Sequence, residues 1–397
     1  MPGGRNNTAA GDFSFAAGYR ANANHNGSFV WADSTNADLA STANDQFMVR
    51  ASGGVTLSVT EGALRLVPRQ SSPNVIGGYS GNSVSSVSGA TIGGGGNSSI
   101  GINQVTAFAH YATIGGGLNN TAGASLATIG GGSGNTASGS IATVGGGTDN
   151  TASGDRATIP GGEGNTADGY FSFAAGRRAQ ANNYGAFVWA DANDFDFAST
   201  ANYEFSARAT GGVRFVSAID GSGTPTAGVI LNAGAGSWSN LSDRNLKENF
   251  APVDAQEVLA HLAEIPITTW NYRSQDPAIR HIGPMAQDFY AALGMGEDDK
   301  HISTMDADGV ALTAVQGLYQ VVQAQDARIE TLEAENGALQ RRLDSLEARV
   351  AALEGQDRAS VAWPGGWSSV GLLVSGLLVG LVVVGRKGML GQSPGGE

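Results

Sequence analysis

The chain has 397 residues, among them 60 glycines and no cysteine, and only 14% of its residues are charged. This length allows two or three domains, but the composition is not that of an ordinary globular enzyme. The net charge is −13 with no large lysine or arginine cluster, which argues against nucleic acid as a partner, and the lack of cysteine excludes disulfides and thiolate metal sites. Small residues crowd into the first 240 positions and Leu, Glu, Arg and Gln into the rest, which predicts a boundary near residue 240.

Two long segments of the first part repeat each other. Residues 11–55 realign without a gap on residues 169–213, at an offset of 158 (169 minus 11). We therefore expect two β-rich head modules, at 1–60 and 164–235. Aromatic side chains dominate burial, so we expect the aromatic pairs that recur at this offset to be core residues, with a sugar-binding platform as the alternative. These pairs are Phe15 and Phe173, Trp31 and Trp189, and Phe47 and Phe205.

Between the modules, residues 61–163 carry a shorter repeat. A β-branched residue follows Ala-Thr every 15 positions, at Ile114, Ile129, Val144 and Ile159. Such a period predicts a solenoid with glycine at corners that need positive φ. One β-branched side chain per turn is a small core, so we expect other chains to supply the missing burial. The A-T-I/V-G-G-G and N-T-A-S-G units resemble the head repeats of trimeric autotransporter adhesins and phage tail fibres, which implies a trimeric left-handed parallel β-roll.

The composition changes at residues 241–250, "LSDRNLKENF", where Ser242 and Lys247 lie five positions apart. A serine becomes a nucleophile when a base takes its proton, and a lysine can be that base if burial lowers its pKa. On a regular helix, five positions leave two side chains about 140° apart. A dyad therefore needs a bend between the two residues or a contact between chains. The residue types alone favour a helix N-cap at Ser242 followed by a solvated face.

This segment, the segment 262–293 and the heptads that follow together resemble the C-terminal intramolecular chaperone of endosialidase-type phage tailspikes. That domain is a family 74 serine peptidase and also occurs in the myelin regulatory factor. The shared elements are S-D-x-x-L-K and H-I-G-x-x-A-Q. The resemblance covers about residues 240–355. It implies an α+β domain at 240–311 that trimerises, helps the upstream fibre to fold and then cuts the chain before the motif serine.

Transferred to this sequence, the resemblance implies that Ser242 is the nucleophile, Lys247 its general base and the bond after Leu241 the cleavage site of a single-turnover serine endopeptidase. Asp243 is a candidate for orienting the dyad, or else a charge at a helix N-terminus. His281 is a candidate supporting residue, or else a hydrogen-bonded structural histidine. The alternative function is a non-cleaving adhesin or stalk, in which the C-terminal part only trimerises and anchors.

Residues 312–354 have the heptad spacing of a coiled coil. The a positions are Ile329, Asn336, Leu343 and Val350, and the d positions are Leu332, Leu339, Leu346 and Leu353. In a parallel, in-register bundle each g residue faces the next e residue of a neighbouring chain. Three of these pairs are attractive: Arg328 with Glu333, Arg342 with Glu347, and Arg349 with Glu354. Leucine at d and the polar Asn336 at a favour two chains. Both family resemblances imply three, so we expect a homotrimer.

After a predicted hinge at 355–366, residues 367–385 form an uncharged run that we expect to be a transmembrane helix. As a helix these 19 residues span about 28 Å, enough for a bilayer core. The basic start of the tail at 386–397 places the tail in the cytoplasm and the head outside. The first 20 residues lack the apolar core of a secretory signal, and a cytoplasmic head is the alternative. Met1 opens directly onto a repeated module, so we favour a start further upstream and an external head.

No cofactor or metal is expected. The histidines show no metal-ligand spacing; they are His25, His110, His261, His281 and His301. Residues 305–309, "MDADG", lack the closing Glu of a calcium loop and are predicted to be a turn. A cell-surface or glycan ligand of the head is compatible with the sequence but is not identified by it.

Overall fold

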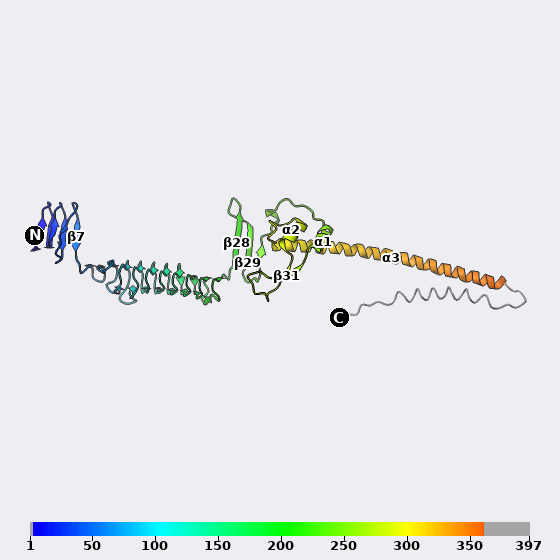
Figure 1. The fold of residues 1–397 in the computed structure, drawn as a ribbon, viewed down its shortest axis with the longest axis horizontal. Coiled ribbons are helices and arrows are strands. Elements are labelled where there is room, and N and C mark those ends of the chain that lie inside the picture. Colours follow the sequence, from blue (N-terminus) through cyan, green and yellow to red (C-terminus); the bar gives the residue numbers. More distant parts are fainter. Residues whose placement is uncertain (1–2, 361–397) are drawn as a thin grey trace. The chain divides into compact units, whose positions relative to one another are not determined.

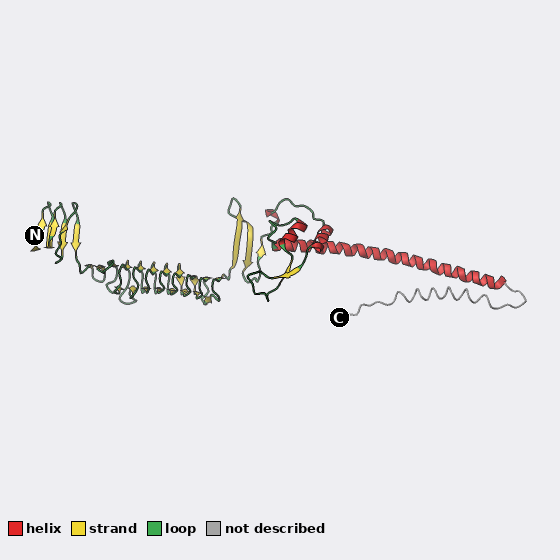
Figure 2. Ribbon diagram, in the orientation of Figure 1, coloured by secondary structure: helices red, strands yellow, loops and turns green. Residues whose placement is uncertain are grey.

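The computed structural model describes residues 3–360 of the chain (Figure 1). It divides into two compact units, Met1–Leu246 and Lys247–Glu397. The first unit contains a β-solenoid of about 14 turns and a small antiparallel sheet. The second contains a small α/β region and one long helix, as the colours of Figure 2 show.

The N-terminal segment of the solenoid consists of two parallel sheets. The four-stranded sheet contains β1 (Gly4–Arg5), β3 (Phe15–Tyr19), β5 (Phe29–Ala32) and β7 (Phe47–Arg50). The three-stranded sheet contains β2 (Thr8–Ala9), β4 (Ala21–Ala23) and β6 (Leu39–Ala40). Their inward-facing residues form a separate small core of alanines and Val30.

The longer part of the solenoid also has two sheets. One begins with the antiparallel strands β8 (Val55–Ser58) and β9 (Ala63–Val67) and continues through β10 (Asn74–Ile76), β12 (Thr91–Ile92), β14 (Thr113–Ile114), β16 (Thr128–Ile129), β18 (Thr143–Val144), β20 (Thr158–Ile159), β23 (Phe173–Arg177), β25 (Phe187–Ala190) and β27 (Phe205–Arg208), with β21 (Gly162–Glu163) beside β23. The other contains β11 (Ser83–Val84), β13 (Gln104–Val105), β15 (Thr121–Ala122), β17 (Thr136–Ala137), β19 (Thr151–Ala152), β22 (Thr166–Ala167), β24 (Ala179–Ala181) and β26 (Phe197–Ala198).

The 15-residue repeat forms the predicted solenoid turns. Strand β16 pairs in parallel with β18, which places Ile129 beside Val144. Each turn buries one β-branched residue from one sheet and one alanine from the other, as Ile129 and Ala137 show with no exposed surface. The interior is therefore narrow, and apolar burial alone does not fill it: a row of asparagines is also fully buried there. This row is Asn82, Asn103, Asn120, Asn135, Asn150 and Asn165.

The expected head module at 164–235 is not a separate fold. Thr158 of β20 pairs with Phe173 of β23, so the module's first strands extend the same two sheets as the short repeat. Its last residues instead enter a three-stranded antiparallel sheet of β28 (Gly212–Ile219), β29 (Pro225–Asn232) and β30 (Ser239–Asn240). The expected roll at 61–163 differs at its start, because β9 pairs antiparallel with its neighbours and parallel stacking begins at β10.

The prediction that the repeated aromatics are core residues is wrong for the single chain. Phe47 is 73% exposed and Phe205 is 69% exposed. Strand residues alternate between faces, and the buried face of these strands holds small residues such as Ala16 and Val30. The phenylalanines lie on the outer face, where they stack in two rows. One row is Phe15, Phe29 and Phe47, and the other is Phe173, Phe187 and Phe205, with ring centroids 4.4–4.9 Å apart.

In the second unit, two short helices and the start of the long C-terminal helix share a small core, and the unit also contains a two-stranded sheet. Helix α1 (Ala255–Glu264) begins at Asp254, whose carboxylate accepts two backbone N–H groups, and α2 (Ala286–Leu293) ends at Gly294 in the left-handed conformation. Strands β31 (Thr268–Trp270) and β32 (His281–Gly283) are antiparallel. The buried core residues of this unit are Val258, Ile265, Phe289 and Val310.

Helix α3 (Thr304–Ser360) carries the predicted heptads and is longer than expected at both ends. The Ser303 hydroxyl accepts the Asp306 N–H at 3.0 Å, which caps the helix and makes residues 305–309 helical rather than a turn. At the other end the helix continues through Gly355 into the expected hinge, because one glycine costs a helix only about 1 kcal/mol. The apolar a and d residues are 41–63% exposed along this chain.

Within residues 3–360, no helix is both long enough and apolar enough to cross a membrane. The rest of the expected hinge, the span predicted at 367–385 and the tail at 386–397 lie outside the described residues.

Candidate self-cleavage site

The predicted cleavage site lies at the end of the antiparallel sheet in the first unit. Strand β30 pairs with β29, so that Ser239 lies opposite Ile230 and Asn240 opposite Val229. The ladder extends one residue further, because the Leu241 N–H donates to the carbonyl oxygen of Gly228 at 3.1 Å. Ser242 is thus the first residue beyond the paired strand, and the bond to be cut lies where the ladder ends.

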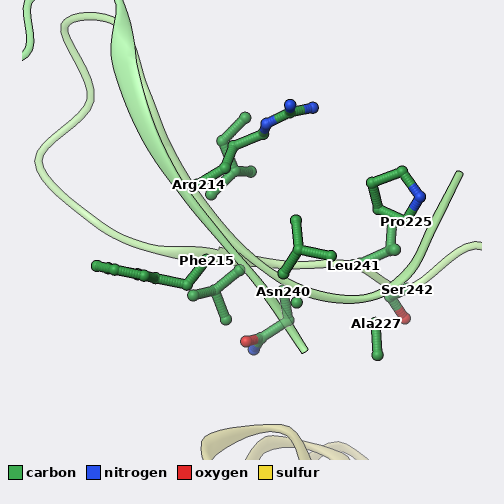
Figure 3. A pocket seen from close by; sticks show the side chains of 11 residues that line it. Arg214, Phe215, Pro225, Ala227, Asn240, Leu241 and Ser242 are labelled. Carbon is green, nitrogen blue, oxygen red and sulfur yellow. The ribbon is translucent and has the colours of Figure 1, made fainter. Parts of the chain in front are cut away.

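A mostly apolar pocket surrounds this end of the sheet (Figure 3). Leu241 and Ser242 contribute to its lining. The other lining residues belong to the three strands and include Arg214, Phe215, Val216, Pro225, Ala227, Ile230 and Asn240. Leu241 is 38% exposed, and its side chain forms part of the pocket wall. The acyl side of the predicted cleavage site is held by backbone pairing with β29.

The chain turns tightly after Ser242. A single turn of 3₁₀-helix, η1 (Arg244–Leu246), follows, and the Asp243 carboxylate accepts the backbone N–H of Asn245 at 2.8 Å. The Leu246 N–H donates to the carbonyl oxygen of Asp243 at 3.2 Å. The Asp243 carboxylate therefore stabilises this turn locally, and its part in the dyad stays a prediction.

The segment between Ser242 and Lys247 contains one 3₁₀ turn and no regular α-helix, so the α-helical separation of about 140° does not apply to it. Both residues are exposed in the single chain. The division between the two compact units falls directly before Lys247, so the predicted nucleophile belongs to the first unit and the predicted base opens the second. The dyad itself stays a prediction.

His281 lies in the second unit, on strand β32, and is partly buried. Its Nε2 is 3.0 Å from Gln275 Oε1, an oxygen that also accepts the Tyr272 N–H. Because that oxygen is an acceptor, Nε2 carries the hydrogen. The imidazole also packs against the Trp270 ring, with centroids 4.8 Å apart. These contacts explain a structural role for His281, and a role in cleavage stays a prediction.

The two copies of the repeated module share an ion pair beside the recurring tryptophan. The Asp191 carboxylate accepts hydrogen bonds from the Thr210 N–H, the Thr210 hydroxyl and Arg208 Nε, at 2.7–2.9 Å. Asp33 has equivalent bonds to Ser52 and Arg50. The hydrogen bonds from Thr210 and Ser52 are the main cause that holds the pKa of each carboxyl well below its usual range. Each carboxylate therefore connects its own solenoid turn to the next turn by hydrogen bonds.

Two other expectations concern ligands. In the part of the chain that the structure describes, no group of three or more His, Asp or Glu side chains is placed to hold a metal ion. The stacked phenylalanines are nearly parallel, with interplanar angles of 3° between Phe15 and Phe29 and between Phe173 and Phe187. Within each row the ring faces cover one another and leave mainly edges outward, whereas sugar stacking uses an open ring face.

One part of the chain matches a known protein family. Residues 242–296 match the family model Peptidase_S74, described as "Chaperone of endosialidase". The chain carries an endosialidase-type chaperone domain. The match begins at Ser242, directly after the paired strand, so the S74 domain starts where the fibre-side sheet ends. No curated protein matches the chain.

Sequence reasoning identified the S74 motif but missed the sheet that presents it. Residues 212–235 were assigned to the expected second module, 236–239 to no domain and 240 to the chaperone domain. Yet "GVRFVSAI" and "PTAGVILN" are runs rich in β-branched residues around a turn at 220–224. Their composition is a strand and hairpin signal. Gly228, which accepts the Leu241 N–H, was missed with them.

Proposed function

We propose that this chain is a homotrimeric, fibre-like protein whose S74 domain acts as an intramolecular chaperone and then cuts the chain between Leu241 and Ser242. The observation that carries the proposal is the family match that begins at Ser242, directly behind a β-solenoid. A solenoid built from interchain contacts folds slowly, because long-range pairings cost entropy before their contacts form. A domain that holds three chains in register reduces that cost.

The exposed apolar side chains support self-association. The apolar a and d residues of α3 are 41–63% exposed in one chain, and the two phenylalanine rows lie on the outer face of the solenoid. Exposed apolar surface of this extent is typical of an interface. Attractive g–e pairs favour a parallel bundle, and the family resemblance favours three chains.

The proposed chemistry uses Ser242 as nucleophile and Lys247 as base. Lys247 takes the proton of the Ser242 hydroxyl, and the oxygen attacks the Leu241 carbonyl carbon. The bond from that carbon to the Ser242 nitrogen breaks, and the nitrogen leaves as an amine with the proton from the lysine. Water then hydrolyses the Leu241 ester, which yields a Leu241 carboxylate and restores the Ser242 hydroxyl.

The cleavage is tested with the full chain on denaturing gels. The wild type should give fragments 1–241 and 242–397, whereas Ser242→Ala and Lys247→Ala should each give one full-length band. Ser237→Ala, which removes an exposed hydroxyl five residues upstream, is the matched control and should cleave normally. Cleavage of both dyad variants would overturn the assignment. An uncleaved wild type that still forms trimers would instead identify a non-cleaving stalk or adhesin.

The membrane anchor at 367–385 is proposed from the sequence alone, with the head outside and the tail in the cytoplasm. An uncharged stretch of this length followed by basic residues supports it. Protease treatment of intact cells distinguishes the two orientations. Digestion of the head by protease added outside whole cells supports an external head, and protection of the head supports the cytoplasmic alternative.

A further inference from the structure

The end of the antiparallel sheet has a geometric requirement at Gly228. This residue lies in β29 opposite Val216 of β28, next to a register shift between Val216 and Ala218. Its φ is +152°, and a Cβ built on it would lie 2.3 Å from the carbonyl oxygen of Phe215. No side chain fits at that distance, so any other residue would push β28 and β29 apart.

The same glycine forms the last hydrogen bond of the ladder. Its carbonyl oxygen accepts the Leu241 N–H at 3.1 Å. Gly228 therefore takes part in two contacts: the close approach of β28 on one side and the pairing with Leu241 on the other. A shift of the Gly228 backbone would move Leu241, whose carbonyl carbon is the atom attacked in the proposed reaction.

We propose that Gly228 is a positioning residue for self-cleavage, and that the antiparallel sheet of β28, β29 and β30 makes cleavage conditional on folding of the fibre. The inference rests on the proposed function. The sheet belongs to the first unit, whereas the S74 match begins at Ser242. The fibre therefore presents the cleavage site as part of its own folded structure.

The physical basis is the loss of freedom at the acyl group. In an unfolded segment each residue samples many backbone conformations, and fixing one residue costs about 1–2 kcal/mol. Pairing of Ser239, Asn240 and Leu241 with β29 fixes these residues in advance. Before the sheet forms, the reacting carbonyl has no fixed position, so premature cutting is slow.

The fate of the product follows from the same pairing. After the bond breaks, Leu241 becomes a C-terminus, and the hydrogen bonds of residues 239–241 to β29 remain available. The new end of the fibre therefore stays paired as the edge of the sheet. The S74 fragment begins with Ser242.

The test compares two glycines of the same hairpin in the full chain. Gly228→Ala introduces the clash with the Phe215 carbonyl, whereas Gly221→Ala lies in the turn, where a Cβ would meet nothing within 4 Å. Gly221→Ala should cleave at the wild-type rate. Gly228→Ala should cleave about 100-fold more slowly, the typical effect of misplacing a reacting group by about 1 Å. Trimer mass and the thermal midpoint of the solenoid should stay unchanged.

A rescue experiment separates positioning from a general folding defect. The natural chain has no cysteine, so the pair Val229→Cys and Asn240→Cys would be the only thiols. These residues form the non-hydrogen-bonded pair next to Leu241, where antiparallel Cα atoms lie close enough for a disulfide. In the Gly228→Ala background, the oxidised pair should restore cleavage to near the wild-type rate, and reduction before folding should abolish the rescue.

Three results would contradict the inference in distinguishable ways. Cleavage of Gly228→Ala at the wild-type rate would overturn the positioning role and leave self-cleavage standing. The positioning role would also be overturned if Gly228→Ala cleaves slowly and the oxidised cysteine pair fails to restore its cleavage. The control for this result is the same cysteine pair in a chain that keeps Gly228, which must cleave normally. An uncleaved wild type would refute the proposed self-cleavage and the inference with it.

Discussion

The buried asparagine row makes a quantitative prediction about the solenoid. Asn135 Oδ1 accepts the backbone N–H of Asn150 at 3.1 Å, and Asn135 Nδ2 donates to the carbonyl oxygens of Gly131 and Gly147 at 2.9 Å. The Gly147 oxygen also accepts the Ser133 N–H, but the Asn150 N–H and the Gly131 oxygen depend on Asn135. Asn135→Ala therefore leaves one backbone N–H, that of Asn150, unpaired in the interior, and removes the partner of the partly buried Gly131 carbonyl.

An unpaired buried polar group costs about 1–3 kcal/mol, so the loss at the Asn150 N–H should lower the free energy of unfolding by about 1–3 kcal/mol. For a unit of this size, that corresponds to a fall in thermal midpoint of about 2 °C or more. The control is Thr136→Ala, because Thr136 is the next residue and lies on the outer, partly exposed face of β17. It should change the midpoint much less.

The assay is thermal unfolding combined with hydrogen exchange of the folded protein. Solenoid stability is close to a sum of turn and neighbour terms, so the loss of protection should concentrate in the turns next to the substitution. Faster exchange of the Asn150 amide is the direct readout. Equal midpoints and equal exchange for Asn135→Ala and Thr136→Ala would refute the reasoning.

Three further predictions concern other parts of the chain. Gly317→Ala should destabilise the second unit by about 1–3 kcal/mol, because its Cβ would lie 2.2 Å from the Ala255 carbonyl oxygen. Gly309→Ala lies in the same helix, where the added Cβ would meet nothing within 4 Å, and should stabilise the unit by up to about 1 kcal/mol. Thermal unfolding measures both changes. Asp191 has a lowered pKa in the folded state, so its contribution to stability should be complete above its ordinary value of 3.8 and should be lost as the pH falls below it. Urea midpoints between pH 6 and 2 should accordingly fall less steeply for Asp191→Asn than for the wild type. Leu343→Glu should weaken the coiled coil and lower the mass of the assembly in sedimentation, and an unchanged mass would contradict the predicted seam.

The sequence was sufficient to predict the solenoid because its signal is periodic. Ile129 recurs in the next turn as Val144, and stacked turns require one inward residue at a fixed step. The prediction for the repeated aromatic residues was wrong, because hydrophobicity alone assigns Phe173 to the interior. The interior is only wide enough for residues such as Ala174 and Val188, so the alternation of the strand turns the rings outward.

At the candidate site, the sequence indicated the chemistry but not the geometry around it. Ser242 and Lys247 were identified from a family motif; the match to residues 242–296 confirms the S74 domain, and the roles of the two residues stay predictions. The pairing of Leu241 with Gly228 depends on a hairpin whose bulge and register arise from tertiary contacts. Local patterns specify such a register weakly. The role of Asp243 in the turn also became clear only from its contact with the Asn245 N–H.

The most direct test of the proposed function is the N-terminal sequence of the C-terminal fragment from the purified wild-type protein. The proposed reaction predicts a fragment that starts with Ser242 and reads Ser-Asp-Arg-Asn-Leu-Lys. A fragment that starts at another residue, or a folded protein that stays full-length, would contradict self-cleavage at this bond.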